Sequence, residues 1–142
     1  MQLGRSIIAT VAAAALAWGA ESARDLNNRG AAAYHAGRVA EAESYYRRAL
    51  GEWQAAGDLG GEAATLGNLA VLCLNAARNG EAATLFERAL ATFKAAGAAD
   101  TRQAAIVLIN FAEFERRLGR MAQAEDAARR AVAILKRQAG NP

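Results

Sequence analysis

One eleven-residue pattern occurs three times in this chain at nearly constant intervals. The central copy is GEAATLFERAL at 80–90; AEAESYYRRAL starts 40 residues earlier at 40–50, and AQAEDAARRAV starts 42 residues later at 122–132. In each copy small, aromatic and aliphatic residues follow one another at steps of 4, 3 and 1, which places them on one helix face. A fixed period of this length is typical of an array of repeated units that pack on their neighbours.

A second recurring segment precedes each copy, so each unit contains two helices. These segments are LNNRG at 26–30, LGNLA at 66–70 and LINFA at 108–112. Together the patterns predict six helices, at about 22–36, 40–56, 60–76, 80–96, 101–118 and 122–139. Asp58 is expected to cap the third helix, and Asp100 with Gln103 the fifth.

The residues at the contacts between paired helices resemble those of the tetratricopeptide repeat family. That family places small residues where its two helices touch and a bulky residue between them. The matching residues are Gly30, Ala42, Tyr46 and Ala49, then Ala70, Ala82, Phe86 and Ala89, then Ala112, Ala124 and Ala131. The resemblance implies an all-α fold, a right-handed α-solenoid of three helix-turn-helix repeats.

The period is longer than the 34 residues usual for this family. It resembles the longer variety found in kinesin light chains and many bacterial arrays. HEAT-type repeats also have periods of about 40 to 47 residues, but the small-residue pattern favours the tetratricopeptide unit. Two departures put the packing of the third repeat in question: Ala128 replaces the aromatic residue, and Glu115 stands where an inward apolar side chain is expected.

Length and composition fit one repeat domain. The 142 residues are 54% hydrophobic, and much of that fraction is alanine, which suits units that bury surface only against their neighbours. We expect a domain at 21–142 with repeats at about 22–57, 58–97 and 98–140. The formal net charge of +3, from 17 basic and 14 acidic residues, argues against nucleic acid as a partner, because binding it needs a concentrated basic surface.

Residues 1–20 differ from the rest of the chain. A short positive start is followed by an uncharged apolar run at 7–18, which has the length of a secretory signal rather than of a membrane-spanning helix. This predicts export to the periplasm or the medium; without cleavage the segment is an apolar N-terminal helix on the first repeat of a cytoplasmic protein, or a membrane anchor.

Reactive side chains are too few for a catalytic or metal site. His35 is the only histidine and Cys73 the only cysteine, so no histidine pair or disulfide can form within the chain. Cys73 lies in an apolar run and is expected to be buried, with no positive neighbour to activate its thiol. We therefore expect no enzymatic activity, no metal and no cofactor.

Asparagine recurs at one position of the first helix in every repeat, at Asn28, Asn68 and Asn110. In the family that the chain resembles, first helices line the concave surface of the superhelix, and asparagine there holds the main chain of a bound extended peptide. The alternative is that these amides bridge neighbouring helices. On the same face we expect Asn27, Ala31, Tyr34, His35, Val71, Asn75, Glu113, Arg116 and Arg117, with the two arginines favouring an acidic end of the peptide.

Two functions fit these sequence features. The first is a non-catalytic protein-protein interaction module that binds an extended peptide in the concave groove. The second is a structural or scaffold element that stacks on another copy through its uncapped last repeat, where Ala128 and Ala131 would form the interface of a homo-oligomer.

Overall fold

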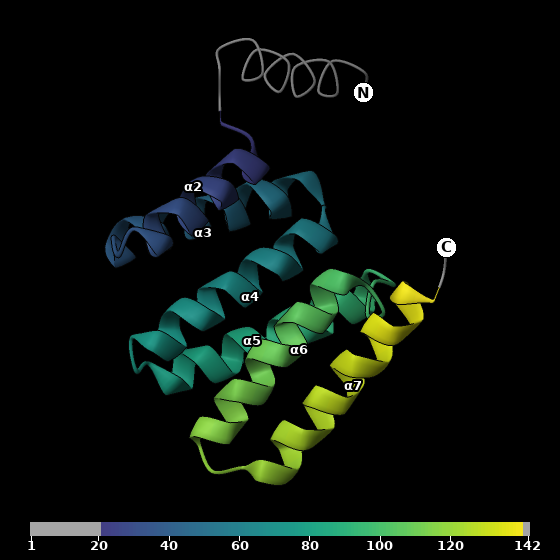
Figure 1. Ribbon diagram of the computed structural model, residues 1–142. Coiled ribbons are helices and arrows are strands. Elements are labelled where there is room, and N and C mark those ends of the chain that lie inside the picture. Colours follow the sequence, from purple (N-terminus) through teal and green to yellow (C-terminus); the bar gives the residue numbers. More distant parts are fainter. Residues whose placement is uncertain (1–20, 141–142) are drawn as a thin grey trace.

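The computed structural model describes residues 21–140, and this part of the chain folds into helices only (Figure 1). The predicted signal segment at 1–20 lies outside the described residues. Six helices form three consecutive pairs, each within about two residues of its predicted bounds: α2 (Ala23–His35) with α3 (Val39–Ala56), α4 (Leu59–Asn75) with α5 (Asn79–Ala95), and α6 (Arg102–Arg117) with α7 (Met121–Ala139). The expected helix-turn-helix fold is confirmed.

The first helix of every pair begins at a side-chain cap. Ser22 accepts a hydrogen bond from the backbone N–H of Asp25, and Asp58 accepts one from Gly61, which satisfies donors left free at a helix start. The prediction for Asp58 is confirmed. The prediction for Asp100 is wrong, because Thr101 is the cap and the Asp100 carboxylate instead lies 2.7 Å from the Arg137 guanidinium.

The turn inside each pair needs one residue with a positive φ. Gly37 and Gly119 supply it in the first and third pairs at 76° and 75°, but Ala77 adopts φ 59° in the second. A left-handed conformation costs a residue with a side chain about 1–2 kcal/mol. Ala77 therefore holds strain that the equivalent glycines avoid.

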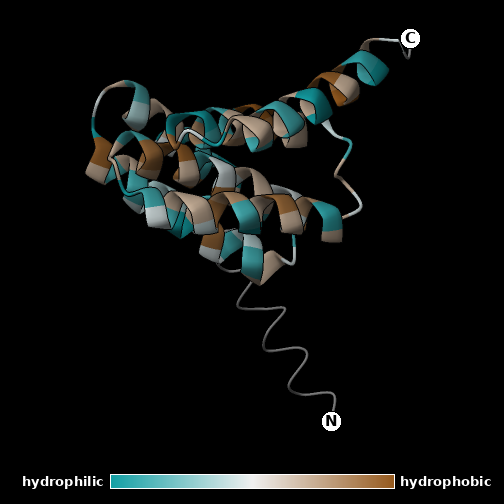
Figure 2. Cartoon of the chain, turned by 90° about the horizontal axis from the view of Figure 1, so that it is seen from below, coloured by the Kyte–Doolittle hydropathy of each residue, from teal (hydrophilic) through white to brown (hydrophobic). Residues whose placement is uncertain are grey.

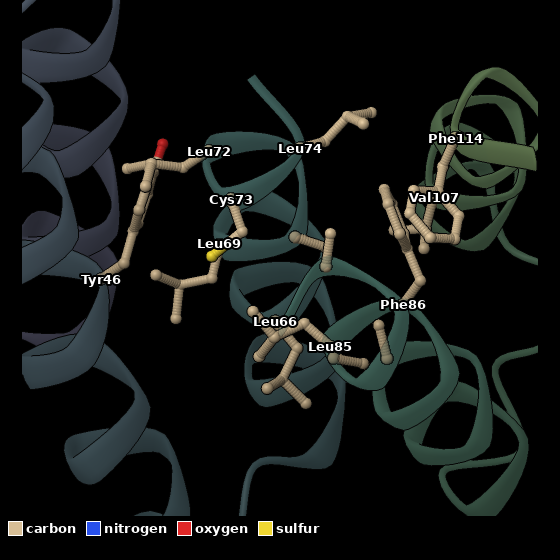
Figure 3. Close-up of a cluster of buried hydrophobic side chains, with 14 of the residues drawn as sticks. Tyr46, Leu66, Leu69, Leu72, Cys73, Leu74, Leu85, Phe86, Val107 and Phe114 are labelled. Carbon is tan, nitrogen blue, oxygen red and sulfur yellow. The ribbon is translucent and has the colours of Figure 1, made fainter. Parts of the chain in front are cut away.

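Helix α4 lies at the centre of the array, as its apolar sequence predicted. Leu66, Leu69, Leu72 and Cys73 on this helix are almost completely buried. Figure 3 shows these side chains between Tyr46 of α3 on one side and a group of third-repeat and α5 side chains on the other. A helix that is apolar on nearly every side needs cover on nearly every side, and within residues 21–140 the second repeat has a neighbouring repeat at each end.

The backbones of successive first helices lie closer together than those of successive second helices. Within residues 21–140, α2 approaches α4 and α4 approaches α6 along their backbones, whereas between α3 and α5 it is long side chains that meet, such as Arg47 and Glu81 at 3.7 Å. Helices that are closer together on one side give the array a concave side formed by α2, α4 and α6. Figure 2 shows hydrophobic and hydrophilic residues side by side along each helix, as expected where only one face is packed.

The third repeat accommodates both of its departures from the family pattern. Glu115 is only 4% exposed, and its carboxylate lies 3.4 Å from the guanidinium of Arg120 in the following turn. Ala128 is exposed, so no bulky side chain is required there. The repeat has a small core of its own made by Ala105, Leu108, Ala127, Ala131 and Ile134.

Candidate functional site

The three recurring asparagines lie at equivalent positions of α2, α4 and α6, the helices of the concave side. Asn28 is exposed, and Asn68 and Asn110 are partly buried. Within residues 21–140 the side chains of Asn28 and Asn110 form no hydrogen bond, whereas Asn68 does. The three positions are therefore equivalent in the fold but not in the bonding of their side chains.

Asn68 takes part in a polar bridge between the first two repeats. Its Nδ2 donates to Oδ1 of Asn27 at 3.1 Å, and the same oxygen accepts from Oγ1 of Thr65 at 3.1 Å. Thr65 in turn accepts from Nε1 of Trp53 at 3.1 Å. For Asn27 and Asn68 the alternative interpretation applies, since these amides join neighbouring helices. Trp53 itself is partly buried.

A second polar bridge crosses all three first helices near their C-terminal ends. Nδ2 of Asn75 donates to the hydroxyl of Tyr34, and Arg117 donates to Oδ1 of Asn75 at 3.1 Å. Three predicted groove residues from α2, α4 and α6 are thus brought together. Hydrogen-bonded contacts between the helices hold this end of the concave surface in one arrangement.

Glu113 pairs with both arginines expected to attract an acidic ligand. Its carboxylate accepts from Arg116 at 2.7 Å and from Arg117 at 2.8 Å. The hydrogen bond from Arg116, followed by that from Arg117, lowers the pKa of Glu113 to about 2. One carboxylate between two guanidinium groups leaves one net positive charge at this end of the surface.

The remaining predicted residues add apolar and neutral surface. Ala31 and Val71 are partly buried on α2 and α4. His35 is exposed, and its ring meets that of Tyr34 edge-on at a centroid distance of 5.8 Å. These side chains offer contact area rather than chemistry.

A cleft of about 430 Å³ opens where α2, α4 and α6 begin. Trp53 and Phe93 supply its aromatic wall, and Arg24 and Gln103 its polar rim. Sequence reasoning missed Arg24 and Gln103 because neither recurs in the other repeats. Both residues lie within one turn of a predicted helix start, and this position could have identified them. In the fold these helix starts surround the same cleft as the equivalent aromatic residues Trp53 and Phe93.

The surroundings of Cys73 differ from the expectation. The thiol is buried as predicted, but Arg78 donates to its sulfur at 3.0 Å, so the expected absence of a positive neighbour is wrong. Burial outweighs that hydrogen bond and raises the pKa of the thiol, which keeps it protonated and unreactive at neutral pH. Within residues 21–140 no cluster of three or more histidine, cysteine or acidic side chains could hold a metal ion.

None of the described helices is both long and apolar enough to span a membrane. A comparison with curated proteins finds no match. The family model of the tetratricopeptide repeat matches residues 21–95, which is more than half of the chain and includes α2, α3, α4 and α5. Its repeats generally mediate protein-protein interaction and are typically non-catalytic. The three helix pairs agree with this match, and the chain belongs to the tetratricopeptide repeat family.

Proposed function

We propose that this chain binds an extended segment of a protein partner along the concave surface of α2, α4 and α6. The observation that carries the proposal is the pair of asparagines Asn28 and Asn110, whose amides lie on that surface without a hydrogen bond to any residue in 21–140. An amide both donates and accepts, so it matches a peptide unit of any sequence.

The spacing of the helices sets the length of segment that can reach both amides. Packed helices lie about 8–10 Å apart, so equivalent positions on α2 and α6 are about 16–20 Å apart. An extended chain advances about 3.3 Å per residue. A segment of about five or six residues therefore spans the distance from Asn28 to Asn110.

Two hydrogen bonds alone give too little affinity. They contribute about 1–3 kcal/mol, while micromolar binding needs about 8 kcal/mol. The cleft beside Trp53 and Phe93 offers an apolar anchor site at one end of the surface. The net positive charge of Glu113, Arg116 and Arg117 favours an acidic residue at the other end.

The test starts with a random peptide library displayed on phage and selected against the immobilised full chain. We expect enriched peptides with an acidic residue near one end and an apolar residue near the other. Affinity is then measured by fluorescence polarisation with the double variant Asn28→Ala, Asn110→Ala, which should bind about 10-fold more weakly because two hydrogen bonds are lost.

Asn79→Ala is the matched control, since Asn79 is an exposed asparagine at the start of α5. It should bind the selected peptides like the unchanged protein. The double variant should also melt at an unchanged temperature. A library that yields no enriched peptide, or peptides that bind the double variant with full affinity, would contradict the proposal.

A further inference from the structure

The third repeat has an apolar face that no residue in 21–140 covers. Ile106 and Ile109 on α6 are 50% and 47% exposed, and Val132 on α7 is 49% exposed. A shallow depression of about 420 Å³ lies along α7 between Glu125 and Lys136, and it is lined by Ala128, Val132 and Ala133 together with the side chain of Arg129. Large aliphatic side chains gathered on one face mark a surface used for contact.

Equivalent positions in the second repeat show what this face is built to do. Gly67 is the equivalent of Ile109, and a Cβ on it would lie 2.6 Å from Val107 of the next repeat. Phe86 is the equivalent of Ala128, and its ring lies 5.5 Å from that of Phe114 in the next repeat. The face of the third repeat therefore has the positions of a stacking surface.

Stacking on the first repeat of another copy is unfavourable. There the position of buried Leu69 is taken by Arg29, and Glu21 lies 2.8 Å from Arg29 and 3.2 Å from Arg48. Both guanidinium groups also lie over the ring of Tyr45, at 5.9 and 5.8 Å from its centroid. Covering these charges with isoleucine and valine would remove them from water with no new partner, which is costly.

We propose that this face binds the same face of a second copy, with the two α7 helices antiparallel about a twofold axis. Two identical apolar faces satisfy one another in such an isologous contact. The charges along α7 fit this direction. With the axis at the level of residues 130 and 131, Glu125 of each copy, which pairs with Arg129 of its own helix at 2.5 Å, also lies level with Lys136 of the other copy. Ala128 then faces Ala133, and these small residues let the helices approach closely.

The first measurement is sedimentation equilibrium of the full chain over a concentration series. We expect a monomer-dimer equilibrium, and Val132→Lys should raise the dissociation constant at least about 100-fold, because each dimer would bury two new ammonium groups, each level with Arg129 of the other copy. Val39→Lys is the matched control: Val39 is a valine of similar exposure, 43%, at the start of α3, and its replacement should leave the dissociation constant unchanged.

Exchanging the charges of Glu125 and Lys136 tests whether the face binds a second copy and whether the two α7 helices are antiparallel. Glu125→Lys should weaken the dimer about 10-fold by placing like charges level with one another, and Lys136→Glu should do the same. The double variant Glu125→Lys, Lys136→Glu should restore the original dissociation constant. A chain that stays monomeric at every concentration, or that associates into species larger than a dimer, overturns the proposal; so does a double variant weaker than either single one. A monomer would point instead to the apolar segment at 7–18 as the occupant.

Discussion

The contact between the first and second repeats and the contact between the second and third use the same positions with different chemistry. We name them the first junction and the second junction. Asn27 and Thr65 meet through a hydrogen bond at the first junction, and the equivalent Gly67 and Val107 meet through apolar contact at the second.

Other polar contacts of the first junction are also replaced by apolar contacts at the second. At the first junction Glu43 reaches across to Arg78, 3.1 Å away; its equivalent at the second is Ala83, and Arg120 there pairs with Glu115 of its own repeat. The second junction gains an aromatic group instead, since Phe86 lies 5.7 Å from Phe111 and 5.5 Å from Phe114. The difference teaches that the repeat backbone fixes where the units touch, while either polar or apolar side chains can make the contact.

The largest expected effect is that of Phe86→Ala, which removes the aromatic centre of the second junction. Phe86 is completely buried, and such truncations cost about 3–5 kcal/mol. Neighbouring repeats are stabilised mainly by each other, so the third repeat should unfold first. In a Trp18→Phe background Trp53 is the only tryptophan, and its fluorescence reports the first junction. The unfolding transition monitored by circular dichroism should therefore occur at a lower urea concentration than the transition monitored by Trp53 fluorescence.

Tyr46→Ala provides the comparison, because Tyr46 is the equivalent buried residue at the first junction. This variant should shift the Trp53 fluorescence transition at least as far as the circular dichroism one. If Phe86→Ala shifts both signals to the same urea concentration, the junctions unfold as one unit and the distinction between them fails.

A smaller effect is expected of Thr65→Val, which gives the first junction the apolar chemistry of the second. The change keeps the shape of the side chain but leaves Nε1 of Trp53 and Oδ1 of Asn27 with one hydrogen bond fewer each. Loss of a partner by buried polar groups costs about 1–3 kcal/mol. The free energy of unfolding, measured by urea titration, should fall by that amount.

Thr84→Val is its control, since Thr84 is exposed and bonds only to the carbonyl of Gly80 in its own helix. Exposed substitutions of this kind stay within about 0.5 kcal/mol. A Thr65→Val variant as stable as Thr84→Val would mean that the hydrogen bonds of the first junction add nothing over apolar contact.

The smallest effect concerns acid. Hydrogen bonds from Arg47 and then Arg78 lower the pKa of Glu43 at the first junction, and Arg116 lowers that of Glu113 to about 2 from its usual 4.5. A carboxyl group whose pKa is lower in the folded than in the unfolded chain stabilises the folded state at pH values above its unfolded pKa. This contribution is lost as the pH falls from about 4.5 towards 2. The melting temperature should drop over this range.

Two variants separate the contributions. Glu43→Gln should make the Trp53 transition less sensitive to acid, because it removes the titrating group that crosses the first junction. Glu113→Gln should leave the acid response of Trp53 unchanged, since Glu113 pairs within α6. Equal behaviour of the two variants would show that the acid response does not come from the junction.

Helix positions could be predicted closely because small and bulky residues recur with the period of the fold. The pairing of polar groups could not. Asn27 and Asn75 bond to side chains 38 to 42 positions away, and no local pattern reveals such partners. The cap at Thr101 was missed because Asp100, one position earlier, satisfied the same pattern, and the contact of Arg78 with Cys73 depends on a turn that folds back.

The recurring asparagines differ in their bonding. Asn68 joins two helices through Asn27, while within residues 21–140 the side chains of Asn28 and Asn110 form no hydrogen bond. Recurrence in sequence placed the three asparagines on one side of the array, because equivalent positions of a repeat point the same way. It could not distinguish an amide used inside the protein from one available to a ligand, since that depends on the neighbour at the next repeat.

The exchange of Asn27 and Thr65 for Gly67 and Val107 also fixes the order of the units. A chain with its second and third units transposed would set Thr65 beside Ile109 and Val107 beside Asn27, so that a hydroxyl and an amide each faced hydrocarbon. Although the repeats share one backbone arrangement, they are not interchangeable. A shuffled or duplicated version of this array would need new contact residues at every junction.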